Sequence, residues 1–128
     1  MMPAESTSFV HDGVTMTEYK NEPFIVGDYK HTEVEFFHST HKKWYTATPF
    51  QQNIFKYIFG YAPISRPDKV FILGGCCDQK NDWSAVSVFA NDNWQSHGSL
   101  NHGRLNFMTI TYGTHVMIIG GILRNDTL

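Results

Sequence analysis

The chain has 128 residues, a formal net charge of -2 at neutral pH and a pI near 6.4. This length favours a single domain, and the near-neutral charge gives no reason to expect nucleic acid or an anionic membrane as a partner. Aromatic residues make up 15% of the chain and charged residues 17%, which is typical of a packed, strand-rich protein and argues against disorder.

The first twelve residues are small and polar, and we expect them to be poorly ordered. They lack the basic start and the apolar core of a secretory signal peptide. No later apolar run is long enough to cross a bilayer as a helix. These features favour a cytosolic protein without membrane insertion. In that compartment the glycosylation pattern that begins at Asn125 has no meaning.

Short apolar or alternating runs predict strands, because each is too short for a helix and is rich in β-branched and aromatic residues. In a first unit, residues 13–48, the predicted strands are Val14–Tyr19, Phe24–Val26, Glu33–Phe37 and Lys43–Thr46. In a second unit, residues 54–97, they are Tyr57–Tyr61, Val70–Leu73, Ala85–Phe89 and Asn93–Gln95. A third unit, residues 104–128, contains Phe107–Tyr112 and Val116–Ile119.

Two details within these units bear on the fold. The stretch Ala62–Lys69 is predicted to be a loop, because its two prolines cannot donate to a strand ladder. The strand Phe107–Tyr112 alternates between two sets of side chains: Phe107, Thr109 and Thr111 on one side, and Met108, Ile110 and Tyr112 on the other.

The second strands of these units belong to a sequence repeat. Val70–Gly75 (VFILGG) returns 46 residues later as Val116–Gly121 (VMIIGG), and a weaker copy, Pro23–Asp28, places Gly27 47 residues before Gly74. A recurrence of this length indicates a repeat architecture. One sheet of this kind cannot bury both of its faces alone, so we expect neighbouring units to cover each other.

The stretch between the two strong copies contains Phe89, Trp94 and Arg104 in that order. This set resembles the kelch repeat, which forms one blade of a β-propeller. The usual aromatic residue is Tyr where this chain has Phe89, and the upstream unit has Ile54 where Arg is expected. The resemblance implies an all-β fold of kelch-type four-stranded antiparallel blades. It assigns structural roles to Gly74, Gly75, Phe89, Trp94, Arg104, Gly120 and Gly121.

About two and a half blades fit in the chain, whereas closed propellers have about four to eight, so we expect an incomplete β-propeller. The chain is then a piece of a longer propeller or a truncated gene product. A closed ring of several copies and a compact two-sheet fold are the alternatives.

The function expected from this resemblance is non-catalytic binding of another protein. In a four-stranded antiparallel blade, the loop after the second strand and the link to the next blade emerge on the same face. The candidate partner-binding residues in these loops are Tyr29, Asp78, Trp83 and Arg124. Trp, Tyr and Arg commonly anchor protein interfaces, although Trp83 could equally fold back over its own blade.

Catalysis and cofactor binding find little support in the sequence. A galactose-oxidase-like copper site would require a Tyr such as Tyr112, one of the adjacent Cys76 and Cys77, and two histidines, but no spacing selects them. His38 and His41 fit solvated loop histidines better than metal ligands, which need three or four converging groups. We therefore expect no catalytic, cofactor or metal residues, with a copper oxidoreductase fragment or an inert truncated product as alternatives.

Overall fold

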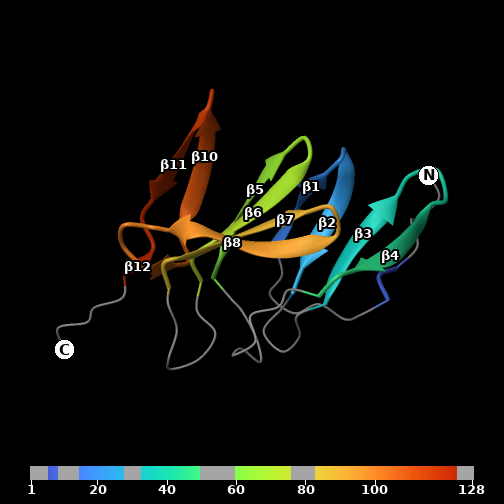
Figure 1. The fold of residues 1–128 in the computed structure, drawn as a ribbon, viewed down its shortest axis with the longest axis horizontal. Helices are drawn as coiled ribbons and strands as arrows, with labels where there is room; N and C mark the ends of the chain where they lie inside the picture. The colour runs from blue at the N-terminus through green and yellow to red at the C-terminus, as the bar shows by residue number, and fades with distance from the viewer. Residues whose placement is uncertain (1–5, 9–14, 28–32, 50–59, 76–82, 124–128) are drawn as a thin grey trace.

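The computed structural model describes residues 6–8, 15–27, 33–49, 60–75 and 83–123 (Figure 1). Within these ranges the chain forms twelve β-strands and no helix, and all pairings are antiparallel. The chain is therefore all-β with antiparallel four-stranded sheets, as the sequence predicts.

Two four-stranded sheets follow each other along the chain, and in both of them every strand pairs with its neighbour in sequence. The first sheet consists of β1 (Thr15–Tyr19), β2 (Glu22–Val26), β3 (Val34–His38) and β4 (Lys43–Ala47). The second sheet consists of β5 (Ala62–Arg66), β6 (Lys69–Leu73), β7 (Ala85–Ala90) and β8 (Asn93–Ser99).

A hairpin follows the second sheet and is called the third hairpin below. It pairs β10 (Met108–Tyr112) with β11 (His115–Ile119). At its base, the short strands β9 (Arg104–Leu105) and β12 (Ile122–Leu123) pair with each other.

The sequence repeat is a repeat of hairpin geometry. Each of the hairpins β1–β2, β5–β6 and β10–β11 joins two five-residue strands through two residues. The second strand of each is followed by a glycine with positive φ: 52° at Gly27, 62° at Gly74 and 72° at Gly120. Ile72 and Ile118 hold equivalent places in these hairpins, since Ile72 pairs with Pro63 and Ile118 with Thr109.

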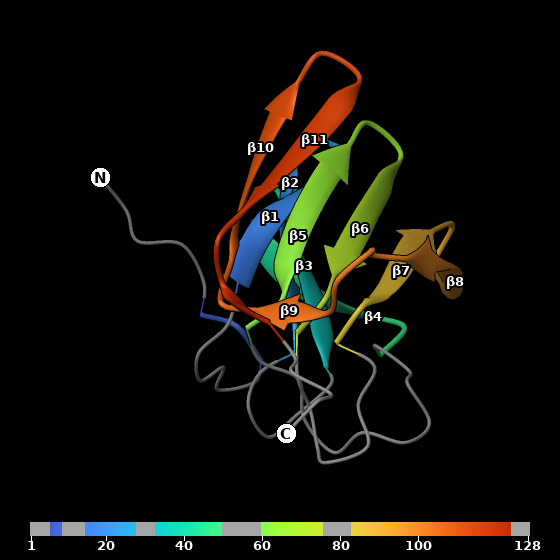
Figure 2. The ribbon, with the colours of Figure 1, turned by 90° about the vertical axis from the view of Figure 1, so that its left-hand side faces the viewer.

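The hairpins lie side by side in chain order, as the two perpendicular views show (Figures 1 and 2). Contacts join β1 to β5 and β5 to β10, so the first strand of each unit lies next to the first strand of the following unit. The second sheet is therefore placed between the first sheet and the third hairpin.

The larger core lies between the first and second sheets. Phe24, Val26 and Val34 from the first sheet meet Val70, Ile72 and Phe89 from the second, and all six side chains are buried. The ring centroids of Phe24 and Phe89 are 5.1 Å apart, a distance at which aromatic pairs attract beyond their apolar burial. The Tyr61 hydroxyl donates to the Val26 carbonyl across the same junction.

A smaller core lies on the opposite face of the second sheet. Ala62, Ile64 and Leu73 pack there with Phe107, and Val116 and Ile118 of the third hairpin are partly buried against them. Both faces of the second sheet are thus covered, as expected for repeat units that cannot bury their surfaces alone.

The predicted loop at Ala62–Lys69 is wrong: this stretch forms β5, a turn at Pro67–Asp68 and the start of β6. Pro63 is compatible with a strand because β5 is an edge strand, where a missing backbone N–H can face away from the sheet. The predicted strand at Tyr57–Tyr61 is also wrong in its described part, since Gly60 and Tyr61 precede β5. Residues 57–59 lie outside the described residues.

Candidate binding surfaces

The glycine pair at the end of β6 allows a close approach of two backbones. The Gly75 N–H donates to the Arg104 carbonyl over 2.9 Å, and a Cβ atom on Gly74 would lie 2.6 Å from that same oxygen. Gly121, the equivalent of Gly75 in the repeat, makes a similarly close approach at the end of β11, where a Cβ atom would lie 2.7 Å from the Leu105 carbonyl oxygen. Side chains at these positions would therefore separate the strand ends from β9.

Arg104 uses its side chain to hold the base of the third hairpin. Its Nη1 atom donates to the Gly120 carbonyl over 3.2 Å, and its Nε atom lies 3.4 Å from the His102 carbonyl. The guanidinium group thus contacts backbone carbonyls on both sides of β9.

Phe89 and Trp94 lie at the junction of the first and second sheets. Phe89 is only 2% exposed, and its ring centroid is 5.0 Å from that of Trp94 on the neighbouring strand. The Trp94 indole N–H donates to the Thr48 carbonyl beyond β4 over 2.9 Å. Phe37 and Trp44 form the matching pair in the first sheet, with centroids 5.4 Å apart.

Three of the four candidate partner-binding residues, Tyr29, Asp78 and Arg124, lie outside the described residues. Trp83 is half-buried. Its carbonyl accepts a hydrogen bond of 3.0 Å from the Arg104 N–H, and a Cβ atom on Gly103 would lie 2.9 Å from the Trp83 Cβ. The backbone of Trp83 is therefore packed against the segment that leads into β9.

A groove of about 580 Å³ opens between the first and second sheets near their turns. Its apolar floor includes Phe36 and Phe89, and its rim includes Lys20, Glu22 and Asp92. The Asp92 carboxylate accepts from the Thr48 N–H over 2.9 Å, so one rim residue also links the two sheets. A hydrogen bond from the Ser39 hydroxyl, 2.7 Å long, is the main cause that lowers the pKa of Glu22.

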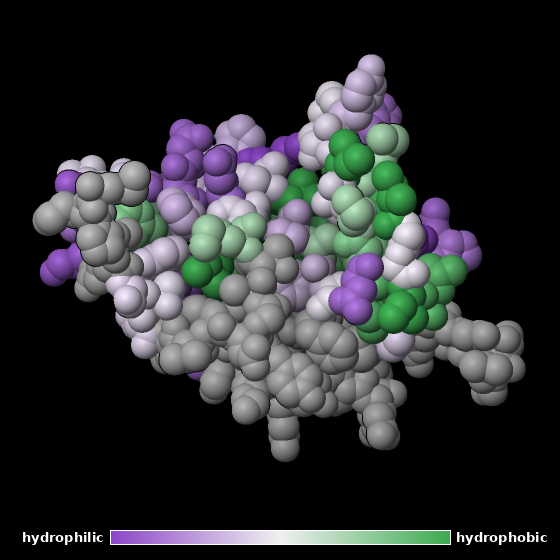
Figure 3. All heavy atoms as spheres, turned by 180° about the vertical axis from the view of Figure 1, so that it is seen from behind, coloured by the Kyte–Doolittle hydropathy of each residue, from purple (hydrophilic) through white to green (hydrophobic). Residues whose placement is uncertain are grey.

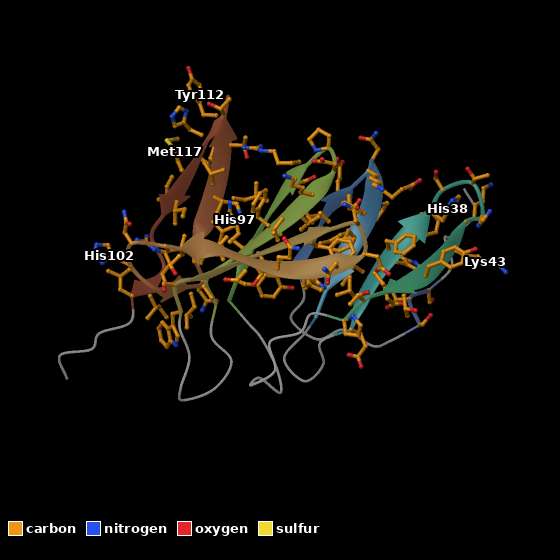
Figure 4. The ribbon with its side chains drawn as sticks, in the orientation of Figure 1. His38, Lys43, His97, His102, Tyr112 and Met117 are labelled. Carbon is orange, nitrogen blue, oxygen red and sulfur yellow. The ribbon has the colours of Figure 1, made fainter. Side chains whose placement is uncertain are left out.

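The histidines near this groove pack with each other. His38 and His41 stack with ring centroids 4.0 Å apart, and the His41 Nδ1 atom lies 2.7 Å from the Tyr45 hydroxyl. Figure 4 shows His38 on the first sheet, far from His97 and His102. In the described part of the chain no group of three or more His, Cys, Asp or Glu residues could hold a metal ion.

Only part of the residue set considered for copper binding lies within the described residues. Tyr112 is exposed at the tip of the third hairpin, while Cys76 and Cys77 lie outside the described residues. Among the described residues, likewise, there is no helix with the length and apolar character needed to cross a membrane.

The third hairpin carries an apolar strip on its outer face, formed by Met108, Ile110, Tyr112, Met117 and Ile119. Their exposed fractions range from 45% for Ile110 to 76% for Tyr112. The surface view shows apolar side chains gathered on this part of the molecule (Figure 3), and Tyr112 and Met117 lie on the side of the hairpin that faces away from β5 (Figure 4). Contiguous exposed apolar patches commonly mark interaction sites.

Sequence reasoning did not identify the apolar strip. The alternation of Met108, Ile110 and Tyr112 with Phe107, Thr109 and Thr111 was a visible signal, but it does not show which side a neighbouring sheet covers. In the structure, Phe107 is buried and Thr109 half-buried on the side of the second sheet, and the more apolar set faces outward.

Comparison with known proteins gives no family for this chain: no protein-family model matches it, and no curated protein matches it.

Proposed function

We propose that this chain is a non-catalytic protein-binding module whose sheets are kelch-type blades of an incomplete β-propeller. The observation that carries the proposal is the stacking of hairpins that recur after 47 and 46 residues, with a positive-φ glycine after each second strand. Propeller blades are four-stranded antiparallel sheets arranged with their first strands innermost, which agrees with the contacts from β1 to β5 and from β5 to β10.

The positions of the motif residues also support a propeller. Phe89 and Trp94 pack at a junction between successive sheets, and Arg104 contacts the carbonyl after β11. In a propeller, side chains must fill the space between successive blades, and hydrogen-bond donors must satisfy the backbone carbonyls of the segments that connect the blades. The recurrence of hairpins with glycines after 47 and 46 residues, together with an aromatic pair in each four-stranded sheet, supports a repeat of blades.

In this proposal the partner binds the loops that follow the second strands and enter the third. In the sequence, Tyr29 lies between β2 and β3 and Asp78 lies between β6 and β7, and Trp83 precedes β7 by two residues. Arg124 follows β12 directly. Loops held by a rigid sheet commonly carry binding residues, and Tyr, Trp and Arg supply most of the energy at protein interfaces.

Site-specific photo-cross-linking tests this function. A photoreactive phenylalanine analogue is placed at Tyr29, at Asp78 or, as a control, at Gln95, an exposed position on β8. The proposal expects the same protein adduct from positions 29 and 78 and none from position 95. Adducts that are equally abundant from the control position, or unrelated between the two loops, would contradict it.

Binding of the identified partner is then measured with the double variant Tyr29→Ala, Trp83→Ala. Affinity should fall by at least about tenfold, since residues of these types account for most interface energy. The melting temperature of the variant is the control, because Trp83 is half-buried and its loss could act through the fold. Full affinity in a stably folded double variant would show that the partner binds elsewhere.

A further inference from the structure

Each sheet of this protein has two distinct faces, which we define by their neighbours. The forward face packs on the next unit along the chain and contains Phe24 and Val26 in the first sheet, and Phe71 and Leu73 in the second. The backward face packs on the preceding unit and contains Val70 and Ile72 in the second sheet, and Val116 and Ile118 in the third hairpin. The same type of contact, forward face on backward face, is therefore made twice.

The apolar strip of the third hairpin is a forward face. Met117 and Ile119 follow Phe71 and Leu73 by 46 residues, and Ile110 follows Ile64 by the same interval. In the second sheet Ile64 and Leu73 are 7% and 6% exposed because the third hairpin covers them, whereas their equivalents Ile110 and Ile119 are 45% and 51% exposed. Among the described elements, none packs against this third forward face.

The first sheet carries a backward face at the other end of the molecule. Ile25 stands at the place of Ile72, and the pair Phe37–Trp44 stands at the place of Phe89–Trp94. The two aromatic pairs have nearly the same geometry, with interplanar angles of 59° and 53°.

This backward face is buried at its centre, where Ile25 is 4% and Glu35 0% exposed, and it is open at its margins, around Phe37, Trp44 and Met16. Residues 6–8 reach it, since the Ser8 N–H donates to the buried Glu35 carboxylate over 2.7 Å. Phe37 and Trp44 nevertheless remain half-buried, and Met16 on β1 is 57% exposed. The equivalents of Met16 in the later units, Pro63 and Thr109, are half-buried between neighbouring units.

We propose that copies of this chain associate head to tail, with the forward face of the third hairpin in one copy packed on the backward face of the first sheet in another. The chain carries both halves of a contact that it already makes twice internally, which is why a second copy is the occupant that fits this strip. The proposal concerns sheet faces and does not depend on partner binding at the loops.

The internal junction shows which side chains would meet. Tyr19 and Phe24 of the first sheet contact Phe89, with centroid distances of 5.2 Å and 5.1 Å. Their equivalents in the third hairpin are Tyr112 and Met117, and the equivalent of Phe89 is Phe37. Tyr112 and Met117 of one copy would therefore pack on Phe37 of the next. An interface between two different patches is heterologous, so it generates a ring or an open chain of copies.

Sedimentation equilibrium on the intact chain tests this proposal with two face variants. The forward-face variant is Ile110→Glu with Met117→Glu, and the backward-face variant is Met16→Glu with Thr46→Glu. Thr46 is exposed on β4 and pairs with Glu35 on the backward face. The control is Gln95→Glu on β8, which adds the same kind of charge at an exposed site of the second sheet. This site belongs neither to the forward face of the third hairpin nor to the backward face of the first sheet.

The average molar mass of the wild-type chain and of the control should rise with protein concentration, whereas each face variant alone should have the mass of a monomer. Burial of an unpaired carboxylate opposes association, and the dissociation constant should rise by at least about tenfold. An equimolar mixture of the two variants retains one intact forward face and one intact backward face, so it should form a dimer and nothing larger.

Other results would overturn the proposal. A wild-type chain that stays monomeric at all concentrations would mean that the strip has a different occupant. A backward-face variant that still dimerises, combined with a monomeric forward-face variant, would indicate strip-on-strip pairing of two copies instead. A mixture that stays monomeric would also contradict head-to-tail packing. Loss of association must not result from unfolding, so each variant should still melt cooperatively. The single variant Met117→Glu, which changes fewer residues, is tested as a milder version of the forward-face variant.

Discussion

The second strand of the second sheet and the second strand of the third hairpin have nearly the same sequence and lie in the same kind of hairpin, yet their burial differs. VFILGG in the second sheet has neighbours on both faces, and Val70, Ile72 and Leu73 are all buried. VMIIGG in the third hairpin has the second sheet on one face only, which leaves Met117 and Ile119 about half exposed.

The comparison shows that local sequence sets the hairpin, while the neighbouring unit decides whether its side chains contribute to stability. Similar side chains at equivalent positions of the two regions should therefore contribute differently to the free energy of unfolding. Matched substitutions in the two regions can test this conclusion directly.

The largest expected effect is at the junction of the first and second sheets. Phe89→Ala should lower the free energy of unfolding by about 3–5 kcal/mol, because it removes a buried ring and leaves a cavity between Phe24, Tyr19 and Trp94. Met117→Ala on the exposed strip should change it by less than about 0.5 kcal/mol. Urea unfolding of dilute protein measures both. Similar losses for the two variants would contradict the difference in burial.

The next effect compares two equivalent glycines. Gly74→Ala should cost about 3 kcal/mol, since the new Cβ meets the Arg104 carbonyl and Phe107 in addition to the strain of a positive φ. Gly120 has a positive φ but no atom within 4 Å of a Cβ, so Gly120→Ala should cost only about 1 kcal/mol. Thermal melting of both variants gives the comparison, and equal costs would rule out the close approach at Gly74.

A smaller effect tests the polar link between the first two sheets. Tyr61→Phe should cost about 1 kcal/mol, because it removes the buried hydroxyl that donates to the Val26 carbonyl. The third unit has Phe107 at the equivalent position and makes no such bond there. Tyr112→Phe, at an exposed hydroxyl, is the matched control and should leave the unfolding free energy unchanged. A neutral Tyr61→Phe variant would show that this bond adds nothing to the junction.

The smallest effect is electrostatic and lies at the turn end of the first sheet. The Ser39 hydroxyl lowers the pKa of Glu22 from its ordinary value of 4.5, so it stabilises the fold above that pH, and the stabilisation is lost as the pH falls through the lowered pKa. In Ser39→Ala the pKa of Glu22 should move back toward 4.5. An NMR titration of the Glu22 carboxyl measures this shift, and an unchanged titration would exclude the Ser39 hydroxyl as its cause.

Much of the fold could be predicted from the sequence because the apolar runs are short and end at glycines. Val70–Leu73 and Val116–Ile119 were predicted as strands in equivalent places, and the structure confirms both. The error at Ala62–Lys69 has a physical origin: proline excludes a central strand but not an edge strand, and edge position depends on the whole sheet.

The candidate surfaces were harder to predict than the strands. Of the four predicted loop residues the structure describes only Trp83, which is half-buried and whose backbone packs against Gly103. The apolar strip depends on which side of β10 faces the second sheet, and the Thr-containing side does so because it continues from the buried Phe107. The sequence of one strand does not say which of its sides a neighbouring sheet covers. The exposed side can therefore be identified only once the packing of the sheets is known.

Pro63 has a consequence for how this molecule can meet others. Because a two-residue turn makes Arg66–Lys69 a hydrogen-bonded pair, alternation along β5 directs the nitrogen of residue 63 away from β6. That nitrogen carries no hydrogen, so a foreign strand laid along β5 would lack one of the donors it requires. Pro63 therefore opposes the addition of further strands at the β5 edge, and with it growth into a continuous fibril. Association through the faces of the sheets remains open.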